Sequence, residues 1–156
     1  MIRKPIKIQL PKEIENLVEG SLFDNDGLIR DDSLSKYLAY NPEIIRIFGL
    51  ALADLKKTKR EMELEVYGLE SKQERVRAGI ILKIDPGVYK NEAMREAKVL
   101  ENEDYLFLIA EIVEVKGDLI EINYEIDKLG ESYWKHKGMQ QSLDSLTKLR
   151  LSERKY

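Results

Sequence analysis

The stretch YLFLIAEIVEVKGDLIEINYEIDKLGESY, residues 105–133, decides the fold of this chain. Alternate steps of three and four residues along it meet only apolar or aromatic side chains, at Tyr105, Leu108, Ile112, Val115, Leu119, Ile122, Ile126, Leu129 and Tyr133. That spacing places all of them on one face of an α-helix, which we call the second seam. Asn102 can cap this helix, and Glu103 and Asp104 suit its positive end. We therefore expect a long helix that begins near Tyr105.

An earlier stretch carries a first seam with the same spacing. Its twelve positions, nine of them apolar, are Ile45, Phe48, Leu52, Leu55, Lys59, Met62, Val66, Leu69, Gln73, Val76, Ile80 and Lys83. A repeat of this kind is typical of coiled-coil packing. We expect the helix to begin at Asn41 and Pro42, because Asn caps helices and Pro at the first helical position loses only an amide that has no partner there. Asp85, Pro86 and Gly87 are expected to end it, since a residue before Pro avoids helical geometry and Gly permits a turn.

Two polar residues, Lys59 and Gln73, interrupt the first seam. In coiled coils such interruptions fix the register or the number of helices. Local geometry that leaves both residues near the surface is an equally good interpretation. The pattern also falters at His136 and Gln140 and resumes through Met139, Leu143, Leu146 and Leu149, so a bend or a new short helix is expected there.

Residues 1–40 are expected to form a short N-terminal extension. IKIQL, residues 6–10, alternates apolar and polar side chains like a short strand, and residues 11–20 can form a short helix closed by Gly20. A further helix is expected near Asp32, which can cap it. The predicted fold class is therefore all-α: two long heptad-patterned helices joined by a basic turn segment, in a coiled-coil or helical-bundle oligomer.

Charge is distributed unevenly along the chain, although the net charge is only −3. Residues 72–98 hold seven Lys or Arg against four Asp or Glu, a net +3, and residues 135–155 have a net charge of +4. Between them, residues 99–131 hold ten acids against two Lys, a net −8. The overall charge therefore does not exclude a polyanionic partner.

Composition limits the remaining classes of protein. The chain has no Cys, which excludes disulfides and thiol chemistry and suits an intracellular protein. No stretch reaches the roughly 18 apolar residues of a membrane helix. We expect a cytoplasmic protein without a membrane partner.

The sequence offers no convincing active site. His136, the single histidine, continues the second seam, where a packing or surface role is expected. A bundle di-metal site needs Glu three residues before His, and Tyr133 stands there. Two carboxylate pairs, Glu61 with Glu65 and Glu121 with Glu125, lie off the seams, where a solvated face is the commoner explanation. No Gly-rich phosphate loop occurs. We expect a protein that is not an enzyme and holds neither metal nor cofactor.

The basic residues between the two long helices are the remaining candidates for a site. They are Lys72, Arg75, Arg77, Lys83, Tyr89, Lys90, Arg95 and Lys98, with Tyr89 as an aromatic among the cations. A helical hairpin brings them towards one tip, where cations can bind phosphates and Tyr89 can stack on a base. The alternative is an ordinary solvated surface in which Glu74 and Glu96 are the partners of these cations.

The stretch VYKNEAMREAKVLENEDYL, residues 88–106, resembles the phage recombination mediator family UvsY. The residues that match the pattern of that family are Tyr89, Lys90, Glu92, Met94, Arg95, Val99, Leu100 and Asp104. By helix pattern alone the resemblance extends over roughly residues 40–150. It implies a ring-forming, non-enzymatic homo-oligomer that binds single-stranded DNA. Such mediators help a RecA-like recombinase assemble on DNA coated by single-strand-binding protein.

The DNA-contacting motif of that family is only partly present. Arg77 and Ala78 fit it, whereas Gly79 stands where a second basic residue belongs, and Ile81 and Leu82 replace paired tyrosines. The resemblance therefore implies that DNA contacts are redistributed. The expected substitutes are Lys72, Arg75, Lys83 and Lys90.

Two hypotheses follow for residues 41–156, which we expect to form one long-helix hairpin domain. In the first, the domain oligomerises, binds single-stranded DNA and acts as a recombination mediator in the cytoplasm of a phage-infected bacterial host. In the second, it is a structural or adaptor coiled coil that binds another protein, with its basic and acidic blocks pairing between subunits. Pairing of the two seams within one chain or between chains is open in both.

Overall fold

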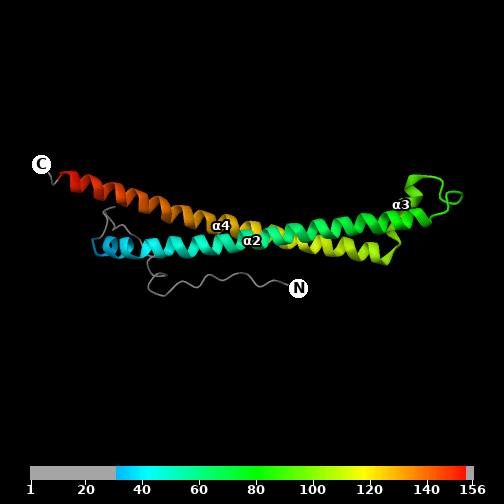
Figure 1. Cartoon of the computed structure of the whole chain (residues 1–156), viewed down its shortest axis with the longest axis horizontal. Coiled ribbons are helices and arrows are strands. Elements are labelled where there is room, and N and C mark those ends of the chain that lie inside the picture. The colour runs from blue at the N-terminus through cyan, green and yellow to red at the C-terminus, as the bar shows by residue number, and fades with distance from the viewer. Residues whose placement is uncertain (1–30, 154–156) are drawn as a thin grey trace, which may run out of the picture. The chain divides into compact units, whose positions relative to one another are not determined.

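The computed structural model describes residues 31–153. Within that range the chain forms three helices: α2 (Asp31–Lys83), α3 (Glu92–Leu100) and α4 (Glu103–Glu153) (Figure 1). No strand occurs among the described residues. The prediction of an all-α chain with two long helices is confirmed. The predicted strand at residues 6–10 and the short helix at residues 11–20 lie outside the described part.

The helix α2 begins earlier than the first seam predicted. Its start at Asp31 confirms the helix expected near Asp32, but the separate start at Asn41 and Pro42 is wrong, because α2 continues through both residues. Asn41 does not cap a helix; its side chain is buried against α4. Pro42 removes one intrahelical hydrogen bond, and the packing of Asn41 holds the chain helical at this point.

The predicted end of α2 is confirmed. The helix stops at Lys83, and the Asp85 side chain then accepts a hydrogen bond from the Gly87 amide at 2.8 Å. The Asp85 carbonyl oxygen accepts from the amides of Val88 and Tyr89 at 3.2 and 3.1 Å. These bonds close a compact turn.

A helix that the sequence did not predict follows the turn. Residues 92–100 form α3, whose first turn is capped by Asn91: its Oδ1 accepts from the Met94 amide at 2.9 Å. Val99 anchors α3, since it is completely buried. The expected cap of α4 is confirmed, because Asn102 Oδ1 accepts from the Tyr105 amide at 3.0 Å.

No new helix begins in α4 near His136 or Gln140, so the predicted alternative of a new short helix is wrong. A single helix runs from Glu103 to Glu153. The two polar residues that break the pattern are instead partners of Asn41 on α2.

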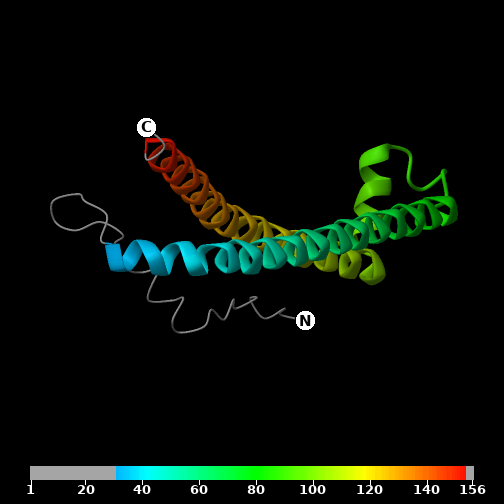
Figure 2. The same cartoon turned by 60° about the vertical axis from the view of Figure 1, so that its left-hand side comes forward.

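The described residues divide into two compact units: residues 31–55 with 125–153, and residues 56–124. We call them unit 1 and unit 2. The core of unit 1 joins Ile44, Phe48 and Leu55 of α2 to Leu129 of α4, with Ile47, Ala51, Leu52, Ile126 and Tyr133 packed around them. In Figure 2 the ends of the two helices in unit 1 separate beyond this cluster. Leu146 and Leu149 are accordingly exposed.

A buried polar cluster closes the core of unit 1. Asn41, with no exposed surface, donates from Nδ2 to the His136 carbonyl oxygen at 3.1 Å and to Gln140 Oε1 at 2.9 Å. Its Oδ1 lies 3.0 Å from His136 Nδ1, which must carry the hydrogen because Oδ1 can only accept. The His136 ring also lies 5.6 Å from the Phe48 ring. The packing role expected for His136 is confirmed.

Unit 2 is built on the continuation of the same two seams. Met62 and Val66 of α2 and Leu108 and Ile112 of α4 are buried. At the edge of this contact, Lys116 Nζ of α4 lies 2.7 Å from Glu70 Oε1 of α2. In each unit the two seams therefore pack within one chain.

The two polar residues of the first seam also belong to unit 2. Lys59 and Gln73 are half-buried, and Lys59 lies 3.8 Å from Glu63, one turn along the same helix.

Replacement of Asn41 by Ala should lower the free energy of unfolding by about 1–3 kcal/mol, because buried groups on His136 and Gln140 lose their partner. Urea denaturation measures this change. Glu43→Ala is the matched control, since Glu43 pairs with Arg46 on the solvated face of the same helix. A loss in Asn41→Ala no larger than in the control would contradict the structural role of the cluster.

Stability should depend on pH through His136. Burial, with a smaller contribution from Lys135, lowers the pKa of His136 below its ordinary 6.5. As pH falls below 6.5, the unfolded chain takes up a proton before the folded one, so the free energy of unfolding should decrease until the folded-state pKa is passed. Urea midpoints measured across this range test the effect, and His136→Gln should remove it because the chain has one histidine.

Candidate nucleic-acid interface

All eight predicted site residues lie in unit 2, on three consecutive segments. Lys72, Arg75, Arg77 and Lys83 are on α2, Tyr89 and Lys90 are in the connection to α3, and Arg95 and Lys98 are on α3. The structure separates them into residues held by other parts of the chain and residues that face solvent.

Arg77 is held between α2 and α3. Its guanidinium binds the carboxylate of Glu96 through Nε and Nη2, with Nε at 3.4 Å, and lies 4.0 Å from Glu74. The hydrogen bond to Glu96, and then the charge of that carboxylate, raise the pKa of Arg77 above its already high value. Glu74 and Glu96 are thus the partners of Arg77, as in the alternative of an ordinary surface. Arg77, which fits the DNA-contacting motif of the family that the sequence resembles, therefore links α3 to α2.

Three further site residues also make contacts within the chain. Arg95 Nε donates to the Tyr89 carbonyl oxygen at 3.2 Å, and both residues are half-buried. Lys98 Nζ lies 2.5 Å from Glu101, and this hydrogen bond raises the pKa of Lys98. The contact of Arg95 with Tyr89 links α3 to the connection, whereas the contact of Lys98 lies within the C-terminal end of α3.

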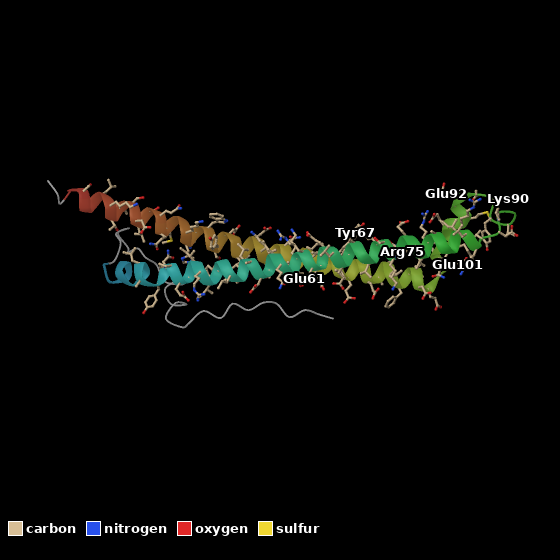
Figure 3. The ribbon with its side chains drawn as sticks, in the orientation of Figure 1. Glu61, Tyr67, Arg75, Lys90, Glu92 and Glu101 are labelled. Atoms are coloured by element: carbon tan, nitrogen blue, oxygen red, sulfur yellow. The ribbon has the colours of Figure 1, made fainter. Side chains whose placement is uncertain are left out.

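The other four cations face solvent. Lys72, Arg75, Lys83 and Lys90 are exposed, and within residues 31–153 none of them forms an ion pair. Figure 3 labels Arg75 on α2 and Lys90 at the connection. They are the same four residues that the resemblance offers as substitutes for the missing motif.

Sequence reasoning missed an exposed aromatic on α2. Tyr67 is 70 % exposed, whereas the predicted Tyr89 is half-buried. Tyr67 lies between Arg60 and Arg75 on the outer face of α2, about 10 and 12 Å from them at about 1.5 Å per residue. The signal was present, because Tyr67 follows Val66 of the first seam and therefore points away from that seam.

Two acids near this face have partners within the chain. Glu63 pairs with Lys59, and Glu74 lies beside Arg77. We call the exposed set Arg60, Tyr67, Lys72 and Arg75, with Lys83 and Lys90 beyond them, the basic face of unit 2. Arg60 and Tyr67 share one side of α2, whereas Arg75 and then Lys72 follow around the helix, Lys72 about 140° from Tyr67. An exposed aromatic flanked by cations can stack on a base while the cations bind phosphates.

No group of three or more His, Cys, Asp or Glu in residues 31–153 could hold a metal ion. Glu61, Glu65 and Glu121 are exposed on solvated helix faces. None of the three helices is both long and apolar enough to cross a membrane.

Comparisons with protein-family models, with curated proteins and with solved structures find no match to this chain.

The Arg77 to Glu96 ion pair should hold α3 against α2. Replacement of Glu96 by Gln is expected to accelerate amide hydrogen exchange in residues 92–100, with little change in global stability because the pair is partly solvated. Glu101→Gln is the control, since its ion pair with Lys98 joins no two helices. Equal exchange in both variants would show that the pair does not fix α3.

Proposed function

We propose that this protein is a recombination mediator that binds single-stranded DNA as a homo-oligomer. In this role it promotes loading of a RecA-like recombinase onto DNA coated by single-strand-binding protein. The observation that carries the proposal is the basic face of unit 2, where Tyr67 lies exposed between Arg60 and Arg75. The resemblance of residues 88–106 to the phage mediator family supports the biological setting, the cytoplasm of a phage-infected bacterium.

The basic face suits a single strand better than a duplex. Base stacking on an aromatic needs an unpaired base, and one stacked base is worth about 1–3 kcal/mol. Arg60 and Arg75 are about 22 Å apart along α2, a distance that admits several successive phosphates between them. A strand that follows the helix can therefore contact cations at both ends and the ring between them.

The eight predicted residues fall into two groups, those that contact phosphates directly and those that make contacts within the chain. Direct phosphate contact is assigned to Lys72, Arg75, Lys83 and Lys90, which face solvent. Arg77 links α3 to α2, and Arg95 links α3 to Tyr89 in the connection. Lys98 pairs with Glu101 at the end of α3. Arg77 can reach DNA only by exchanging Glu96 for a phosphate.

Self-association raises the overall affinity for one DNA strand, although each single contact is weak. Each subunit offers a few phosphate contacts, and one strand that touches several subunits binds them with a high effective concentration. A strand arrayed in this way is held extended, ready for a recombinase.

A second candidate function rests on the apolar surface of α4. Leu106, Val113 and Ile120 are exposed on one side of this helix. A structural or adaptor protein that binds another protein would use such a surface, with its acidic and basic blocks pairing between subunits. This candidate requires no nucleic-acid binding.

Fluorescence anisotropy with labelled single-stranded and duplex oligonucleotides separates the two functions. The mediator should prefer the single strand, and its affinity should fall with salt with a log–log slope of about −0.7 for each phosphate contacted. The double variant Lys72→Ala/Arg75→Ala should bind about tenfold more weakly or worse and lose about 1.4 from that slope.

Arg46→Ala/Lys128→Ala is the matched control, since it removes the same charge from exposed positions in unit 1. It should leave the affinity unchanged. Absence of single-strand binding at low salt favours the adaptor function. Binding that is equal in the two double variants refutes the assignment of the basic face.

Tyr67 should contribute by stacking and not by charge. Tyr67→Ala is expected to lose about 1–3 kcal/mol of binding free energy, roughly fivefold to a hundredfold in affinity, with no change in the salt slope. Tyr67→Phe keeps the ring and should bind like the wild type. A Tyr67→Ala variant with full affinity would remove this residue from the interface.

A further inference from the structure

In unit 2 the helix α4 is apolar on two opposite faces. One is the second seam, buried against α2. The other, which we call the outer stripe, consists of Leu106, Ala110, Val113, Gly117, Ile120 and Tyr124. Its large members are 45 % (Leu106), 63 % (Val113), 72 % (Ile120) and 64 % (Tyr124) exposed, and Phe107 beside it is 63 % exposed. A helix with two apolar faces requires two neighbours, and α2 supplies only one.

We propose that the outer stripe binds the outer stripe of a second copy of this chain, with the two α4 helices parallel. This inference rests on the self-association in the proposed function, but not on DNA binding. The stripe repeats in alternate steps of four and three residues, as the second seam does. Over residues 106–124 it extends for about 27 Å. The same repeat on a second helix places the apolar side chains of the two stripes opposite one another in successive layers.

The charges beside the stripe favour the parallel orientation. Lys116 precedes Gly117 on one side, and Glu121 follows Ile120 on the other. In a parallel pair, the residue just before a stripe position on one helix faces the residue five positions further along the other helix. Lys116 therefore meets Glu121 of the second copy, and symmetry repeats the contact. Lys116 also binds Glu70 of its own chain at 2.7 Å, but an ammonium group has three donors and can serve both acids.

The antiparallel orientation has the opposite electrostatics. Its two-fold axis near residue 115 would bring Glu114 towards Glu114 of the second copy and Lys116 towards Lys116. Both contacts are between like charges, which destabilise a helix pair. The same two helices therefore attract in one orientation and repel in the other.

The size of the stripe suits reversible association. Phe107 and Tyr124 would each bury up to about 150–250 Å², and the three aliphatic side chains add about 60–120 Å² each when fully covered. At the observed exposures, roughly 400 Å² per copy becomes available, about half of a standard interface side of about 800 Å². The stems of Glu114, Lys116 and Glu121 can enlarge this area. Ala110 and Gly117 let the two backbones approach, and a Cβ on Gly117 would meet nothing within 4 Å in its own chain.

Parallel pairing has a consequence for the basic face. The α3 ends of the two units 2 lie at the same end of the pair, so Lys83 and Lys90 of both copies are available to one strand. Dimerisation then increases the number of phosphate contacts without any change within a subunit.

Cysteine cross-linking tests the interface directly, because the chain has no Cys of its own. Val113→Cys should form a disulfide-linked dimer under mild oxidation, since the two Val113 positions share one layer of the parallel pair. Ala78→Cys, an exposed small residue on the outer face of α2, is the control and should remain monomeric. Disulfides only between Val113→Cys and Gly117→Cys in a mixture would overturn the parallel orientation, and disulfides between Val113→Cys and Ala78→Cys would overturn the α4 to α4 contact.

Ile120→Lys gives a second measurement that does not depend on oxidation. The side chain is exposed, so helix content by circular dichroism should stay unchanged while the light-scattering mass falls to that of a smaller assembly. An unchanged mass, or a wild type that is monomeric at all concentrations, overturns the proposal. The two inferences fail separately: an intact dimer without single-strand binding refutes only the DNA site, and single-strand binding by a monomer refutes only the interface.

Discussion

Mutual burial of the two heptad seams is the constraint on which the rest of the structure depends. A helix of about fifty residues with one apolar face is not stable alone in water, because most helical stability in proteins comes from packing of that face. In this chain the partner is the next long helix. In unit 1 the pairing is sealed by Ile44, Phe48, Leu55 and Leu129, and in unit 2 it continues through Met62 and Leu108.

The buried amide of Asn41 adds specificity to that apolar contact. Two heptad seams can slide past each other by seven residues and still bury apolar side chains. Such a slip would place Leu129 or Leu143 where His136 stands, and a leucine side chain cannot donate to Asn41 Oδ1 as the His136 ring does in the native alignment. A single buried Asn in a coiled coil is known to set alignment in the same way, at some loss of stability. Interruptions of the pattern at 136 and 140 were therefore signs of a long-range contact.

The sequence predicted what depends on local chemistry and missed what depends on tertiary partners. Both long helices, the cap at Asn102 and the stop at Asp85 to Gly87 follow from spacing and backbone preferences, and the structure has them. The start at Pro42 was wrong because burial of Asn41 outweighs the usual effect of proline. The short helix α3 was missed, since its nine residues carry too few apolar positions to show a period.

In the candidate site, too, the sequence predicted what depends on local chemistry and missed what depends on tertiary partners. Charge counting along the sequence located the basic residues, but it could not separate Arg77, which Glu96 holds, from Arg75, which faces solvent. Glu96 is nineteen residues away in sequence, and only the fold of α3 brings it to Arg77. Tyr67 lies on α2 outside the charged segment of residues 72–98, so the charge pattern did not predict it as part of the site.

Proline inside α2 interrupts the hydrogen-bond ladder of that helix at one place. Because Pro42 has no amide hydrogen, the carbonyl oxygen of Leu38 lacks its usual helical donor. Fraying that starts at Asp31 can therefore proceed to this point without breaking a hydrogen bond on the far side of it. Beyond it, Asn41 and Ile44 are fully buried, and further opening would expose the core of unit 1. The part of α2 from Asp31 to Leu38 can thus open without breaking a hydrogen bond to an amide beyond Pro42.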